Sequence, residues 1–133
     1  MTHQFSESLR NARADTYESH IGASPTLEIR TGAPPANCAA ADSGTLLATV
    51  AMPADWMAAA SAGAKAKSGT WSDTADAAGT AAHFRIKASG GTVHHQGTVT
   101  ATGGGGDMTV DNAVFAVGQA FSITTFGFTE GGA

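Results

Sequence analysis

The second half of the chain, from Gly79 onward, consists of short apolar segments separated by glycine runs. In the segments 81–87, 93–100 and 120–128, apolar and polar residues alternate roughly every second position, as a strand with one buried face requires. Ser89-Gly90-Gly91 joins two of these segments, and glycine tolerates the positive φ of tight hairpin turns. We therefore predict a mainly β protein that buries one face of its sheet.

The first residues predict a helix instead of a strand. Phe5, Leu9 and Tyr17 recur at nearly helical spacing, with charged residues between them, and Gly22 supplies a natural stop. We therefore assign residues 1–22 to one amphipathic N-terminal helix, which either caps the β domain or reaches a neighbouring subunit.

Further strands are expected between the helix and Gly79. Residues 55–62 have helix propensity, but the glycines at positions 63 and 69 favour a short strand over 65–71, which we prefer. Strands spaced in this way predict one antiparallel β-sandwich or jelly-roll-like domain of about eight strands over residues 23–133. The other expected strands are 25–31, 46–52 and 107–110.

The charge pattern argues against a nucleic-acid partner. The chain of 133 residues has 7 basic and 11 acidic residues, a net charge of −4, whereas a phosphate backbone requires clustered basic side chains.

No apolar run approaches the ~18 residues of a membrane span, and the first residues lack a basic region followed by an apolar stretch. We expect a protein kept in solution, with no membrane partner.

The histidines raise the question of a metal site, because imidazole is a common metal ligand. His94 and His95 are adjacent, however, and neighbouring strand residues point to opposite faces, so they cannot easily chelate one ion. His83 could join either of them across a hairpin. Oxygen donors could then come from Asp73, Asp76 or Asp107. We favour the simpler interpretation of histidines in a half-exposed strand, and predict no metal.

No other motif supports catalysis. Cys38 is the lone cysteine and lies in a proline-rich loop, and the run 103–106 lacks the Lys-Ser/Thr pair of a phosphate-binding loop. Serine, histidine and aspartate occur without an ordered signature. We therefore expect no catalytic residue, no cofactor and no enzymatic activity.

Several larger side chains are candidates for subunit contacts. Trp56 and Trp71 are interpreted as core or interface residues, with a sugar-stacking platform as the alternative. Phe5 and Leu9, one turn apart on the predicted helix, are expected to bury an assembly contact. The candidate assembly residues are Phe5, Leu9, Arg10, Arg13, Trp56 and Trp71.

The order of the segments resembles a group of small structural proteins encoded by tailed bacteriophages. The resemblance covers most of the chain, but it consists of structural segments and includes no active-site residues. The segments that carry it are Leu9-Arg10-Asn11-Ala12-Arg13, Leu27-Glu28-Ile29-Arg30-Thr31-Gly32 with Ala33-Pro34-Pro35-Ala36, Gly44-Thr45-Leu46-Leu47-Ala48, Ala78-Gly79-Thr80-Ala81-Ala82-His83-Phe84-Arg85-Ile86 and Gln96-Gly97-Thr98-Val99.

The resemblance implies a virion component, made in the host cytoplasm and placed on the head surface in preference to the tail. It implies a decoration or cement protein that binds the major capsid protein, clamps neighbouring capsomers and assembles with itself as a dimer or trimer. The alternative that it leaves open is a head- or tail-fibre or neck component that binds a receptor or glycan.

Overall fold

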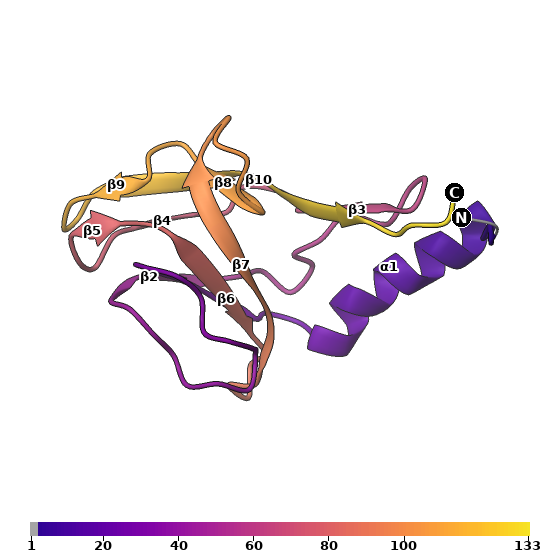
Figure 1. The fold of residues 1–133 in the computed structure, drawn as a ribbon, viewed down its shortest axis with the longest axis horizontal. Helices are drawn as coiled ribbons and strands as arrows, with labels where there is room; N and C mark the ends of the chain where they lie inside the picture. Colours follow the sequence, from indigo (N-terminus) through magenta and orange to yellow (C-terminus); the bar gives the residue numbers. More distant parts are fainter. Residues whose placement is uncertain (1–2) are drawn as a thin grey trace.

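The computed structural model describes residues 3–133, so Met1 and Thr2 of the predicted helical segment 1–22 lie outside the described residues. The described chain forms one helix and ten strands (Figure 1). These are α1 (Glu7–Ile21), β1 (Thr26–Arg30), β2 (Leu46–Ala51), β3 (Ala64–Ala66), β4 (Ser72–Thr74), β5 (Gly79–Thr80), β6 (His83–Lys87), β7 (Val93–Ala101), β8 (Met108–Val110), β9 (Val114–Phe115) and β10 (Ala120–Thr129).

Helix α1 has a defined cap at each end. The Ser6 hydroxyl accepts a hydrogen bond from the Leu9 amide at 3.2 Å, and the Gly22 amide donates to the Glu18 carbonyl at 2.9 Å. Gly22 has a φ of 92°, which glycine adopts without strain. The predicted helix and its stop at Gly22 are therefore confirmed. No helix of the described chain is long and apolar enough to cross a membrane.

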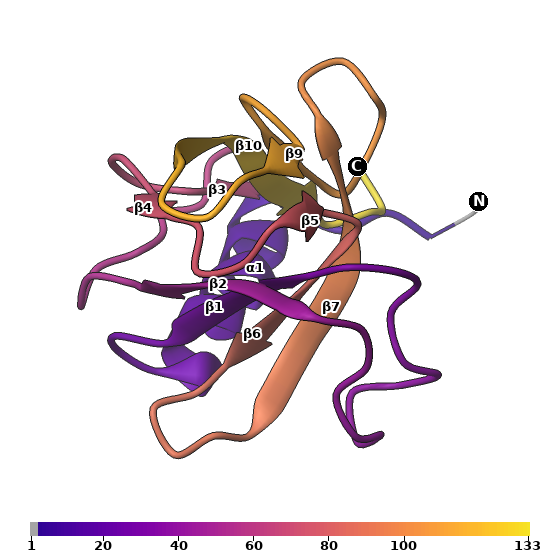
Figure 2. The same ribbon diagram turned by 90° about the vertical axis from the view of Figure 1, so that its left-hand side faces the viewer.

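Eight strands form one sheet, in the order β2-β1-β6-β7-β8-β10-β3, with β4 also paired to β10. Strands β5 and β9 form a separate pair. The large sheet curls so far that its edge strand β2 reaches the residues after β4, where the Leu47 carbonyl accepts the amides of Asp76 and Ala77 at 2.7 and 3.3 Å (Figure 2). The mainly β class is confirmed. A sandwich or jelly roll is not confirmed, because a single curled sheet surrounds the core.

The strands with a clear alternating pattern lie where the sequence predicted them, and so does the short strand β8, which was expected over 107–110. Of the expected strand 65–71, only β3 is formed, and β4 begins just after Trp71. Residues 55–62 form no helix; Met57 and Ser61 instead make isolated bridges to Lys67 and Ala64. Strands β5 and β9 have two residues each, too few for an alternating pattern.

Strands β7 and β8 are parallel, although only residues 102–107 connect them. A parallel connection ordinarily needs a dozen or more residues, so this loop must turn back very tightly. A Cβ at Gly104 would lie 2.7 Å from the Thr100 hydroxyl oxygen, and one at Gly106 would lie 2.9 Å from the Thr100 amide nitrogen. The glycine run therefore allows the close return of the chain.

The sheet and α1 enclose an apolar core. Its largest completely buried apolar side chains include both tryptophans, which are 0% and 1% exposed. Strand β1 places alternate residues in this core as the sequence predicted, whereas β6 is buried at four consecutive positions and β7 contributes Val99. Its members include Leu27, Ile29, Leu47, Trp56, Trp71, Phe84, Ile86, Met108, Phe121 and Phe126.

The close packing in the loop between β7 and β8 predicts that a side chain at Gly106 destabilises the protein. Gly106→Ala places a methyl group 2.9 Å from the Thr100 amide nitrogen and 3.0 Å from the Met108 carbonyl oxygen, both backbone atoms. We expect it to lower the free energy of unfolding by about 1–3 kcal/mol, measured by urea denaturation. Gly90→Ala is the matched control, because no heavy atom lies within 4 Å of a Cβ there. Equal stability of the two variants would contradict this account of the loop.

Candidate functional site

Helix α1 binds the sheet domain through a row of polar side chains. Glu7, Asn11, Asp15 and Glu18 occupy one side of the helix at spacings of four, four and three residues, and each accepts a backbone amide of the segment 57–63. These amides are not part of a regular ladder, so the helix supplies their partners. The pairs are Glu7 with Ala62 at 3.3 Å, Asn11 with Gly63 at 2.8 Å, Asp15 with Ala60 at 2.9 Å and Glu18 with Met57 at 3.3 Å.

A buried lysine neutralises the last two carboxylates of this row, Asp15 and Glu18. Lys65 on β3 is 2% exposed, and its Nζ donates to Asp15 Oδ1 at 2.7 Å and to Glu18 Oε1 at 2.9 Å. Burial lowers the pKa of Lys65, but the two carboxylates outweigh burial and the net shift is upward. The hydrogen bond from Lys65 lowers the pKa of Asp15. A pocket of about 540 Å³, lined by these three side chains and by Asp55, opens beside them.

The aromatic side of α1 enters the core through Tyr17. Its ring lies 5.6 Å from the Trp56 ring and 4.8 Å from the Phe128 ring, measured between centroids. Its hydroxyl is 2.7 Å from His95 Nδ1, so a strand histidine and a helix tyrosine satisfy each other inside the aromatic cluster. Burial raises the pKa of Tyr17 and lowers that of His95, the latter against a weaker opposing effect of the Asp107 charge.

The four predicted assembly residues on the N-terminal segment have different environments. Arg10 is buried, and its Nη1 donates to the Ala62 carbonyl at 3.0 Å. Phe5 is half-buried, its amide donates to the Gly132 carbonyl at 2.7 Å, and the Arg13 guanidinium lies 5.2 Å from its ring centroid. Arg10 and Phe5 therefore bind their own chain, whereas Leu9 is 46% exposed and the side chain of Arg13 is 48% exposed.

The two tryptophans lie together in the core, with ring centroids 6.0 Å apart. Their indole nitrogens donate to the carbonyls of Gly22 and Ser68, each at 3.1 Å. The interpretation as core residues is confirmed within the chain. The alternative of a sugar-stacking platform is wrong for these residues, because neither ring presents an open face.

The structure does not bring together the histidines considered for a metal site. The β6–β7 register pairs His83 with Thr98 and His95 with Ile86, so neither His94 nor His95 lies opposite His83. His83 is fully buried and its Nδ1 lies 2.7 Å from the Gly32 carbonyl oxygen. Over residues 3–133, no group of three or more His, Cys, Asp or Glu side chains is placed to hold a metal ion.

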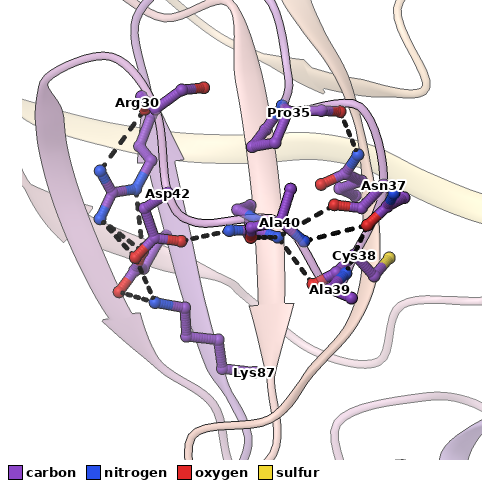
Figure 3. A network of polar contacts seen from close by, with 12 residues as sticks. Arg30, Pro35, Asn37, Cys38, Ala39, Ala40, Asp42 and Lys87 are labelled. Atoms are coloured by element: carbon purple, nitrogen blue, oxygen red, sulfur yellow. Dashed lines mark hydrogen bonds and ion pairs between the residues drawn. The ribbon is translucent and has the colours of Figure 1, made fainter.

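A second polar network, at the other side of the sheet, fixes the loop between β1 and β2 (Figure 3). Arg85 on β6 is 1% exposed and donates to the Asp42 carboxylate and to the carbonyls of Cys38 and Ala40 at 2.9 and 3.0 Å. Asp42 also binds Lys87 at 2.9 Å and Arg30 at 3.2 Å. The sequence offered no sign of this burial, because Arg85 and Lys87 resemble an ordinary exposed pair.

Large apolar side chains remain exposed at both ends of the molecule's longest axis. Leu9 belongs to α1 at one end, and Val114, on β9, is 64% exposed at the other end (Figure 1). Val117, in the turn after β9, is 71% exposed. The sequence analysis identified Leu9 but missed both valines, whose only signal was an apolar pair beside a glycine.

Comparisons with known protein families, with curated proteins and with solved structures find no match.

The Asp42 network makes a prediction about acid stability. Asp42→Asn leaves Arg85 buried without its carboxylate, so we expect the free energy of unfolding at pH 7 to fall by about 2 kcal/mol. The pKa of Asp42 lies below its ordinary value of 3.8, chiefly because Lys87 donates to it, with burial opposing and Arg85 and Arg30 adding to the shift. Its stabilising contribution is therefore present above pH 3.8 and is lost as the pH falls below that value. Chemical denaturation from pH 7 to pH 3 should show the two proteins converging only in acid; a constant difference would refute the assignment.

The burial of His95 beside Tyr17 predicts that the stability of the protein falls between pH 7 and pH 5. Because burial lowers the pKa of His95 below 6.5, the unfolded chain binds this proton more readily than the folded chain, and stability is lost as the pH falls through 6.5. We expect His95→Gln to remove that part of the decline in thermal stability between pH 7 and pH 5. Tyr17→Phe, at constant pH 7, should cost about 1–2 kcal/mol by leaving His95 Nδ1 unpaired. An unchanged pH profile in His95→Gln would show that another group titrates.

Proposed function

We propose that this chain is a structural component of a tailed-phage particle, a decoration or cement protein that binds the major capsid protein and clamps neighbouring capsomers. The observation that carries the proposal is the position of the exposed apolar residues, Leu9 at one end of the long axis and Val114 with Val117 at the other. The resemblance of the chain to small phage structural proteins supplies the biological setting.

Two separated contacts suit a molecule that joins two neighbours. Burying one large aliphatic side chain contributes about 1.5–3 kcal/mol, which is too little for a stable complex by itself. Two such contacts on one particle act together, because binding at one end raises the effective concentration at the other. Repeated over a symmetric shell, weak contacts of this kind hold adjoining units together.

Internal ion pairs hold α1 and the loop between β1 and β2 to the sheet in the region between the two ends. Lys65 and Arg85, both buried, bind carboxylates of the same chain, one connecting α1 to β3 and the other connecting a loop to β6. Their charges are neutralised internally, so these residues support the two ends instead of offering a binding site. On this proposal the protein acts at the surface of the phage head, as a dimer or trimer, without catalysis or a cofactor.

The direct test is co-sedimentation of the purified protein with empty phage capsids and, separately, with isolated tails. We expect saturable binding to capsids at a fixed number of copies per capsomer. Leu9→Asp and the double variant Val114→Asp/Val117→Asp should each weaken binding by about tenfold or more, since either change removes one apolar contact. Thr70→Asp is the control, because it adds the same charge at another exposed position.

Each other outcome has a defined meaning. Binding to tails alone would move the protein to the fibre or neck class. Binding to neither particle would refute the virion role. Unchanged binding by both apolar variants would show that the capsid contact lies elsewhere on the surface.

A further inference from the structure

Two histidines from different elements face each other where the last turn of α1 passes β7. The ring centroids of His20 and His94 are 5.0 Å apart, and their planes meet at 81°. Both side chains line a pocket of about 410 Å³ that is open to solvent and is also bordered by Tyr17 and Glu130. His20 is exposed and His94 half-buried, so an ion in solution can reach both rings.

We propose that His20 and His94 form a two-histidine site for a late divalent transition-metal ion, of which Zn²⁺ is the representative. Zn–N bonds of about 2.0–2.1 Å and a tetrahedral angle place the centroids of two bound imidazoles about 5 Å apart. The observed separation of 5.0 Å matches this value, so the two rings are already spaced as ligands of one ion require. Two water molecules would occupy the remaining tetrahedral positions.

The surrounding charges are compatible with a bound cation. His20 lies in the last turn of α1, where the helix dipole places partial negative charge. Arg13, which also lines the pocket, is paired with Glu130 at 3.3 Å, so its positive charge is balanced. Imidazole ligands select zinc, nickel and copper over magnesium and calcium, which prefer oxygen.

A metal ion at this position would connect α1 directly to the middle of the sheet. The helix is otherwise held to that part of β7 by the Tyr17–His95 hydrogen bond and aromatic contacts. Because the ion binds only the folded arrangement of the two histidines, it would raise the stability of the protein with increasing metal concentration. This property is independent of the proposed virion role.

The test is titration of the metal-free protein with ZnCl₂, followed by isothermal calorimetry and thermal unfolding. We expect one ion per chain, and an increase in Tm of about 10 °C when free Zn²⁺ is 100 times its Kd. His20→Gln and His94→Gln should each reduce the affinity at least tenfold. His3→Gln is the matched control, since it removes an exposed histidine outside the pocket, and MgCl₂ should have no effect.

Circular dichroism will show whether each variant is folded. If His94→Gln does not fold, because position 94 is half-buried, the result for His20→Gln decides the proposal. Absence of saturable Zn²⁺ binding in the wild-type protein would overturn the proposal. Wild-type affinity in folded His20→Gln, or loss of binding in His3→Gln, would also overturn it, because the metal would then be bound elsewhere.

Discussion

The docking of α1 on the segment 57–65 is the interaction on which the rest of the structure depends. Residues 57–63 are not part of a regular strand ladder, so several of their backbone amides need other hydrogen-bond partners. Lys65 is only 2% exposed, so its charge needs a carboxylate partner. The polar row of α1 supplies both at once. Leaving the part-buried amides of Met57 and Gly63 and the buried ammonium group of Lys65 unpaired would cost several kcal/mol, so the helix is an integral part of the β domain.

This arrangement also determines which face of α1 is available to other molecules. Because Asp15 and Glu18 bind the domain and Tyr17 enters the core, the opposite side of the helix carries Leu9 outward. At the other end of the molecule, Phe115 is buried while its neighbour Val114 is exposed. Each end is thus held to the core by other side chains while Leu9 or Val114 faces solvent, which gives the proposed clamp one contact point at each end.

The sequence predicted the elements that have a strong repeating pattern and failed where the pattern was too short or the side chain had a remote partner. Strands β1, β2, β6, β7 and β10 lie close to their predicted positions, since alternation reports a half-buried strand directly. The helix was predicted from its apolar spacing, yet much of its docking is polar. The burial of Arg85 could not be predicted, because nothing near it in sequence shows that Asp42 and two loop carbonyls surround it.

The sequence by itself determined the mainly β class and the N-terminal helix with its glycine stop, because local spacing and residue type carry that information. Only the tertiary structure decided that the sheet curls until β2 meets the chain after β4, that the glycine run closes a parallel pair, and that Leu9 and Val114 lie at opposite ends. It also brought His20 and His94 together. These features depend on contacts between residues far apart in the chain, which no local pattern encodes.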